Sequence, residues 1–207
     1  MNRIKKGASI SEKSVGRYSY PLPVKASGAY LDWLEAGRHI ANQDPIIPQQ
    51  ERIIKGPFLT SLSPESHTGS SLWAIDFLVP DGTKIIAAAG GIIEAAVDSH
   101  SEWGPTDKSA KALNYVTLRH DFGGQIEYSQ YGHLELNSFT KYGLKIGDFV
   151  KRGQLIGVVG KNGWTDRDHL HFMVFKSIVA PPGWQSLIVR FWTTGFFTTV
   201  LNWLRKN

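Results

Sequence analysis

The sequence contains no cysteine, and this absence excludes two kinds of site. The chain cannot form a disulfide framework, and it cannot hold a metal ion through thiolates. Any bound metal must therefore be held by His, Asp or Glu side chains. The absence does not fix the compartment, because exported bacterial enzymes can also lack cysteine.

Long hydrophobic runs are also missing. The longest, Ile85 to Val97, is interrupted by Gly90, Gly91 and Glu94, so it predicts two strands around a Gly-Gly turn rather than a membrane span. Residues 1–13 are basic but lack the apolar stretch of a signal peptide. We therefore expect no transmembrane segment and recognise no export signal.

The charge is uneven along the chain. The formal net charge is +5, residues 176–207 contain no acidic residue, and basic residues outnumber acidic ones in residues 1–60. Basic flanks suit an anionic macromolecular partner, and a solvated basic surface would give the same pattern. No arginine-rich run or RNA-binding signature is present, so we expect no nucleic-acid partner.

Short apolar runs separated by turns dominate residues 61–176. The 21 glycines and 10 prolines of the whole chain favour turns and short strands over long helices. Many short strands with frequent turns predict a mostly antiparallel β domain. The expected strands are Leu72–Val79, Lys84–Ala89, Ile92–Val97, Tyr115–His120, Gln125–Leu134, Phe149–Val150, Leu155–Val159 and His169–Phe175.

Two flanking segments complete the predicted organisation. Residues 1–60 form an irregular arm with one short helix over Tyr30–Ile40, and we expect its aromatic residues to pack on the β domain. Such an arm could cover a sheet edge or occlude part of a cleft. Residues 177–207 predict a C-terminal extension, with a strand at Ser186–Thr193 and a short amphipathic helix over Phe196–Lys206.

The sequence His169-Leu170-His171-Phe172 is the sharpest local motif. Alternate residues of a strand share a face, so both imidazoles would enter one site while Leu170 and Phe172 turn into the core. Neutral imidazole nitrogen is a good ligand for zinc. A polar pair on an exposed strand would give the same short pattern.

Three more polar residues interrupt apolar surroundings. Asp76 lies inside the run Trp73–Phe77, where a carboxylate needs a partner, a metal ion or backbone N–H groups. His67 precedes it by nine residues in a loop-like stretch, and His133 follows Tyr131-Gly132. Taken singly, each is also consistent with an ordinary loop or half-buried side chain.

Taken in order, His67, Asp76, Tyr131-Gly132-His133 and His169-Leu170-His171 resemble the M23 family of zinc metallopeptidases, the lysostaphin/LytM-type peptidoglycan endopeptidases. The glycine-rich stretch Gly147–Gly163 before the last motif is similar as well. The spacing between His67 and Asp76 is longer than in many members, and residues 99–111 resemble an insertion that would form a wall of the cleft.

The resemblance implies one Zn²⁺ per chain, with His67, Asp76 and His171 as ligands and an open fourth position for water. It implies catalytic roles for His133 and His169, of which one would accept the water proton and the other would stabilise the oxyanion or protonate the leaving amine. The implied reaction is hydrolysis of peptide bonds in peptidoglycan stem peptides or cross-bridges. That substrate implies a periplasmic, cell-wall or secreted location.

Two other interpretations follow from the same residues. A catalytically inactive M23-like domain that regulates wall hydrolases would share the fold, although such domains typically lose ligands. Residues 147–163 also resemble the hairpin of biotinyl and lipoyl carrier domains, with Lys161 as the lysine to be modified.

Overall fold

A computed structural model describes residues 12–23, 37–38, 40, 52–55 and 58–192 of the chain. The expected helix over residues 196–206 lies outside this part, and the expected helix over residues 30–40 lies largely outside it.

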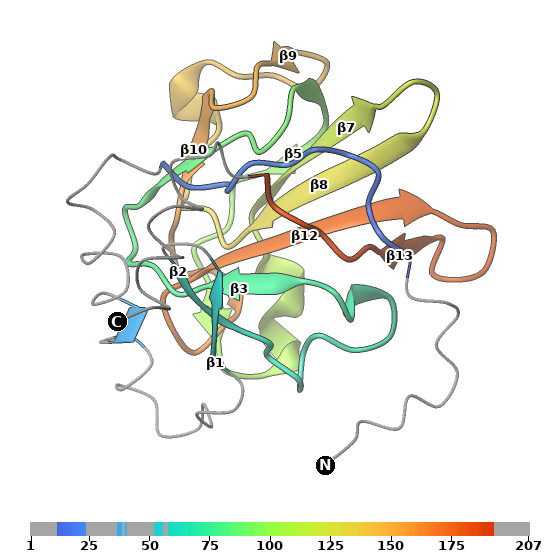
Figure 1. Cartoon of the computed structure of the whole chain (residues 1–207). Helices are drawn as coiled ribbons and strands as arrows, with labels where there is room; N and C mark the ends of the chain where they lie inside the picture. Colours follow the sequence, from blue (N-terminus) through green and yellow to red (C-terminus); the bar gives the residue numbers. More distant parts are fainter. Residues whose placement is uncertain (1–11, 24–36, 39, 41–51, 56–57, 193–207) are drawn as a thin grey trace, which may run out of the picture.

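One antiparallel sheet organises the described part of the chain (Figure 1). Its strand order is β1-β2-β3-β12-β8-β7-β5-β9, and β13 pairs with the C-terminal end of β12 on the edge that faces β3, opposite β8. The strands are β1 (Arg52–Lys55), β2 (Phe58–Ser61), β3 (Ile75–Phe77), β5 (Gly91–Val97), β7 (Tyr115–Asp121), β8 (Ile126–Gly132), β9 (Phe149–Val150), β12 (Leu170–Ser177) and β13 (Trp184–Ser186). This architecture confirms the mostly β, antiparallel fold class.

Smaller elements flank the sheet. Strands β4 (Lys84–Ile86) and β10 (Leu155–Val158) pair antiparallel, and β6 (Trp103–Gly104) and β11 (Gly163–Trp164) pair in parallel. The described residues also include short 3₁₀ helices: η2 (Gly69–Ser71), η3 (Asp107–Ala112) and η4 (Thr140–Tyr142). Within the described residues, no helix is long and apolar enough to cross a membrane.

Side chains of the central strand β12 point alternately to the two faces of the sheet. Leu170 and Phe172 are fully buried in the hydrophobic core, whereas His171 between them is only partly buried and lines a cleft on the opposite face. This is the alternation expected for a strand with one face on the core. The strand itself begins at Leu170, one residue later than predicted.

Residues 12–23 cross the core face of the sheet, drawn in blue in Figure 1. Tyr18 and Leu22 are fully buried there, and the backbone of this segment bonds to the segment after β13. Ser14 N donates to the Ile188 carbonyl (3.0 Å), and Trp192 N donates to the Tyr18 carbonyl (2.7 Å). The division of the chain at residues 60 and 176 stays a prediction.

The expected strand over Ser186–Thr193 is wrong in its position. Strand β13 ends at Ser186, and the following residues leave the sheet because Leu187 and Val189 turn into the core. Ile188 and Phe191 instead make isolated parallel bridges with Lys13 and Tyr18. Strands β1 and β2 were not predicted, and they extend the sheet from β3.

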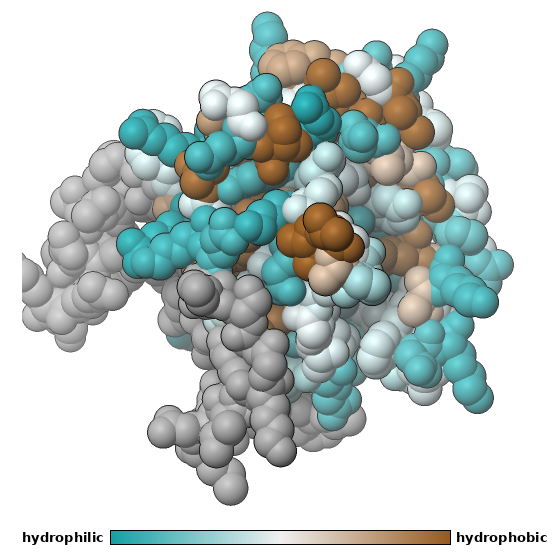
Figure 2. Space-filling model, turned by 90° about the vertical axis from the view of Figure 1, so that its right-hand side faces the viewer, coloured by the Kyte–Doolittle hydropathy of each residue, from teal (hydrophilic) through white to brown (hydrophobic). Residues whose placement is uncertain are grey.

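The face of the molecule at the right of Figure 1 mixes hydrophobic and hydrophilic residues. Figure 2 shows brown side chains interspersed with teal and white ones over this face. Such scattered hydrophobic residues are ordinary for a protein surface.

Candidate metal centre and cleft

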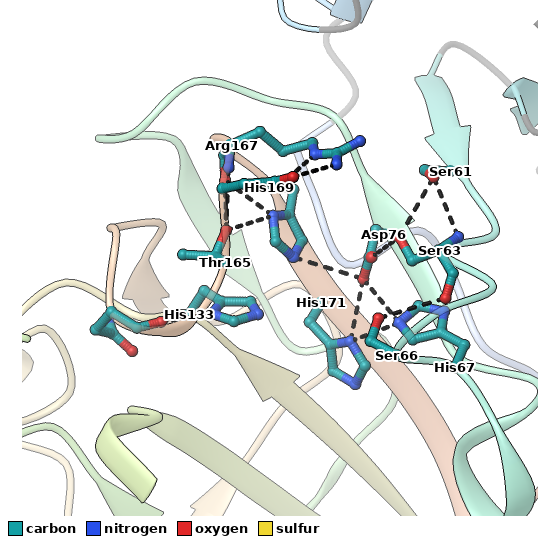
Figure 3. A network of polar contacts seen from close by, with 12 residues as sticks. Ser61, Ser63, Ser66, His67, Asp76, His133, Thr165, Arg167, His169 and His171 are labelled. Atoms are coloured by element: carbon teal, nitrogen blue, oxygen red, sulfur yellow. Dashed lines mark hydrogen bonds and ion pairs between the residues drawn. The ribbon is translucent and has the colours of Figure 1, made fainter. Parts of the chain in front are cut away.

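Three side chains that lie far apart in the sequence converge on one point of the cleft (Figure 3). Oδ1 of Asp76 lies 3.0 Å from Nδ1 of His171 and 3.3 Å from Nε2 of His67, and the two nitrogens are 3.2 Å apart. The sequence analysis predicted these three residues as a ligand set, and the structure brings them together.

Strand pairing explains this convergence. Asp76 on β3 is the direct partner of His171 on the antiparallel strand β12, and side chains of directly opposite residues lie on the same face. The residues between His67 and Asp76 form η2 and a turn that returns the chain to β3. The backbone N of His67 donates to the Ser63 carbonyl (2.8 Å), and the Ser63 hydroxyl donates to Asp76 Oδ2.

The electrostatics of the cluster keep Asp76 ionised. Burial would raise the pKa of Asp76, but the imidazoles of His67 and His169 and the hydrogen bond from His171 hold this pKa well below its usual range. Burial lowers the pKa of His171. Burial also opposes charge on His67, but the Asp76 carboxylate outweighs it and raises the pKa of His67.

This donor set fits a zinc ion. Two imidazole nitrogens and one carboxylate oxygen lie within 4.8 Å of one another, and each is an atom type that zinc accepts. One Asp76 oxygen faces both imidazoles, and its second oxygen accepts from Ser63. Such a hydrogen bond to a ligating carboxylate orients it for the metal.

Two further imidazoles border the cluster, as the sequence analysis predicted. The rings of His133 and His169 have centroids 4.4 Å apart, and Nε2 of His169 lies 3.7 Å from Asp76 Oδ1. His133 follows directly after β8, and His169 directly precedes β12, so adjacent strands deliver both rings to one end of the cleft.

Backbone carbonyls fix the tautomers of both rings. Nδ1 of His133 lies 2.7 Å from the Asn162 carbonyl, and Nδ1 of His169 lies 3.0 Å from the Arg167 carbonyl. A carbonyl only accepts, so each Nδ1 carries the proton and each neutral ring keeps its lone pair on Nε2. Burial, followed by the neighbouring imidazoles of His169 and His171, holds the pKa of His133 well below its usual value.

The cleft has a volume of roughly 460 Å³, and the predicted insertion forms part of its wall. Pro105 and Ala110 line it from within residues 99–111, Leu113 lines it just after this segment, and Trp164 lines it from β11. The interpretation of this segment as a cleft wall is therefore confirmed.

Lys161 lies outside the cluster and is already engaged. Its Nζ lies 2.9 Å from Asp168 Oδ1 and 5.1 Å from the centroid of the Trp103 ring. A lysine held in this way is a poor candidate for the free hairpin-tip lysine of a carrier domain.

Sequence reasoning missed the residues that support the imidazoles. The Thr165 hydroxyl lies 3.3 Å from Nδ1 of His169. The main-chain carbonyl of Asn162 accepts from Nδ1 of His133, and that of Arg167 accepts from Nδ1 of His169. Main-chain carbonyls leave no mark in residue identity, so only the Asn162-Gly163 turn signal pointed to this region.

The family-model comparison agrees with this site. The model of peptidase family M23 matches residues 70–181, which is more than half of the chain, and the chain therefore belongs to peptidase family M23. His67 lies just before the matched range.

Several curated relatives resemble the same region. Lysostaphin from Staphylococcus simulans is 32% identical over 118 residues, which cover 56% of this chain and 20% of lysostaphin. Peptidoglycan DD-endopeptidase ShyC from Vibrio cholerae is 32% identical over 108 residues, 52% of this chain and 20% of ShyC. An uncharacterized metalloprotease from Buchnera aphidicola is 31% identical over 121 residues, 58% of this chain and 27% of the relative.

The matched region thus spans about a fifth to a quarter of the length of these relatives. Among solved structures, the catalytic domain of lysostaphin is 27% identical, with a TM-score of 0.40, over 55% of this chain and 74% of that domain.

Proposed function

We propose that this chain is a zinc-dependent endopeptidase that hydrolyses peptide bonds in peptidoglycan stem peptides or cross-bridges. The observation that carries the proposal is the convergence of His67, Asp76 and His171 beside two imidazoles whose Nδ1 atoms face main-chain carbonyls. Membership in a peptidase family and relatives named as a peptidoglycan DD-endopeptidase and a glycyl-glycine endopeptidase support the substrate class.

In this proposal His67, Asp76 and His171 hold one zinc ion. A zinc ion in such a site lowers the pKa of its bound water and polarises a carbonyl. The low pKa of Asp76 keeps the carboxylate in the ligand form, and the low pKa of His171 keeps its imidazole neutral, as ligation requires.

The imidazoles of His133 and His169 would transfer protons during the reaction. A neutral imidazole accepts a proton at Nε2, and the imidazolium formed then donates it to the leaving amine or to a developing oxyanion. The Asn162 and Arg167 carbonyls hold the Nδ1 protons of His133 and His169 throughout, so neither ring needs to turn between the two steps.

Metal analysis tests the ligand set. Asp76→Asn and His171→Ala should lose most of the zinc, because each removes one of three ligands. Asp121→Asn is the matched control, because Asp121 lies on the exposed end of β7 and its carboxylate accepts from Gly124 N (2.6 Å), away from the candidate ligands. Full zinc retention in His171→Ala would contradict the assignment.

Digestion of purified peptidoglycan, with product masses read by mass spectrometry, tests the reaction. Walls with direct D,D cross-links and walls with glycine bridges should be compared, because the two named specificities of the relatives differ. His133→Ala and His169→Ala should retain zinc and lose activity by about 100-fold or more. A zinc-loaded wild-type chain that cleaves neither wall would favour a regulatory M23-like domain.

A further inference from the structure

Two asparagine side chains, Asn114 and Asn162, are completely buried behind His133. Neither reaches the three candidate ligands, and neither side chain lines the cleft. A buried amide group is costly unless its donors and acceptors are satisfied, so the partners of these two side chains indicate what they do.

Asn162 joins His133 to the cleft wall. Its main-chain carbonyl accepts the Nδ1 proton of His133 (2.7 Å), and its side-chain oxygen accepts from the backbone N of Asn114 (2.7 Å). Its side-chain nitrogen donates to the carbonyl of Leu134, the residue after His133. The turn that carries Asn162 is therefore fixed both to the His133 ring and to the backbone that follows it.

Asn114 closes the wall segment at both ends. Its Oδ1 accepts from the backbone N of His100 (3.0 Å), and its Nδ2 donates to the His100 carbonyl (2.8 Å) and to the Leu134 carbonyl (3.1 Å). The Asn114 side chain thus joins the two ends of the segment 100–114 by hydrogen bonds. Its bond to the Leu134 carbonyl attaches this segment beside His133.

The wall and the turn also touch directly. Gly163 has a φ of +75°, and a Cβ at this position would lie 3.0 Å from Cα of Leu113. Leu113 lines the cleft, so the turn of Asn162 packs on the wall backbone at the closest approach that glycine permits. The pairing of β6 with β11 adds a second connection.

His133 itself needs this support. Its φ is +59°, a left-handed conformation that histidine adopts infrequently and that neighbouring contacts must maintain. The backbone of Gly160 bonds to the His133 carbonyl (2.8 Å), and the two asparagines fix the Nδ1 side of the ring and the following carbonyl.

We propose that Asn114 and Asn162 are positioning residues that hold His133 with Nε2 toward the cleft and fix the wall of residues 100–113 in the same frame. The expected loss of activity in the asparagine variants rests on the proposed function. The expected change in the tautomer of the His133 ring does not. Positioning by the two asparagines makes the placement of His133 and the shape of the cleft interdependent.

The ring can be observed without any substrate. In the full-length, zinc-loaded chain labelled with ¹⁵N-histidine, long-range ¹H–¹⁵N correlation distinguishes a proton on Nδ1 from one on Nε2. The spectrum of His133→Gln assigns the His133 signals. We expect an Nδ1–H ring in the wild type and a mixture of tautomers in Asn162→Ala, because the accepting carbonyl is no longer held in place.

Activity on peptidoglycan provides the second measurement. Asn162→Ala should keep its zinc and lose between about tenfold and 100-fold in kcat, the range expected for a displaced catalytic group. Asn114→Ala is a second variant for the case that Asn162→Ala does not fold. It loses the bond from His100 N and both donated hydrogen bonds without burying a charge, and it leaves the Asn162 carbonyl on the His133 ring, so both effects should be present but smaller.

Ser138→Ala is the matched control. Ser138 is also fully buried and bonds to the backbone of Val158 (2.5 and 3.2 Å), and within the described part of the chain its hydroxyl makes no hydrogen bond to His133. It should lower the melting temperature and leave the His133 tautomer and kcat unchanged. A wild-type tautomer in both asparagine variants would overturn the proposal, as would an equal loss of kcat in Ser138→Ala. A chain without peptidase activity but with the expected tautomer change would overturn the proposed function alone.

Discussion

Glu127 offers a sharp test of how the N-terminal segment is held. This carboxylate is buried, only 4% exposed, on the core face of β8. It accepts hydrogen bonds from Val15 N (2.7 Å), the Ser14 hydroxyl (2.7 Å), the Tyr18 hydroxyl (3.2 Å) and Gly16 N (3.3 Å). All four donors belong to residues 14–18, so a single side chain anchors that segment.

The expected cost follows from these bonds. A hydrogen bond to a charged group contributes about 1.5–3 kcal/mol, so the 2.7 Å bond from Ser14 alone gives about 1.5 kcal/mol at the lower limit, and the 3.2 Å bond from Tyr18 adds to it. Glu127→Gln keeps one oxygen for Val15 N, but its amide nitrogen cannot accept from Ser14 or Tyr18. We therefore expect Glu127→Gln to lower the free energy of unfolding by about 2–4 kcal/mol.

Urea unfolding of the full chain at saturating zinc measures this change. Glu94→Gln is the control, because Glu94 is exposed on β5 and should change stability by no more than about 0.5 kcal/mol. Ser14→Ala combined with Glu127→Gln should cost less than the sum of the single changes. A loss below about 0.5 kcal/mol in Glu127→Gln would refute the anchoring role.

Two further predictions concern the buried His120. Burial lowers its pKa although the Gly90 carbonyl and Glu127 favour the charged form, so its contribution to stability is complete above about pH 6.5 and is lost as the pH falls toward the lowered value. Relative to His120→Gln, the wild type should lose up to about 1.4 kcal/mol per pH unit in that window, and equal slopes in urea unfolding would contradict this. Gly91→Ala should cost about 1–3 kcal/mol, because the new Cβ would lie 2.6 Å from the Arg119 carbonyl and 2.7 Å from His120 Nδ1. Gly90→Ala meets nothing closer than 3.4 Å, so an equal change in melting temperature for the two variants would show that this contact is unimportant.

The sheet was predictable where local pattern and burial agree. The run that ends at Val97 alternates between buried and exposed residues from Gly91 to Glu94 and forms β5, and the run from Tyr115 forms β7, each close to its expected bounds. Strands β1 and β2 were missed because four-residue segments carry little periodicity. The segment after Ser186 was misjudged because its apolar residues pack on residues 12–23, not on a neighbouring strand.

The candidate site was likewise predictable only in part. His169 and His171 could be placed in one site because two residues of a strand suffice for the inference, and the structure places both beside Asp76. The supports of His133 could not be found, since Asn162 acts through its carbonyl and lies 29 residues away in sequence. Contacts between main-chain atoms and distant residues depend on the completed fold, and residue identity alone does not encode them.

Strand β12 shows why the core and the site cannot be treated separately. Leu170 and Phe172 fill the core from one face of β12, and His171 enters the cleft from the other. Because the side-chain period of a strand is two, a shift of β12 by one residue would exchange these faces and bury the imidazole. The pairing of His171 with Asp76 and with Gly132 fixes this register. A Cβ at Gly132 would lie 3.3 Å from Cβ of His171, so the absence of a side chain there leaves room for the His171 ring. The hydrophobic core therefore sets the register of β12, and that register brings the candidate ligands together.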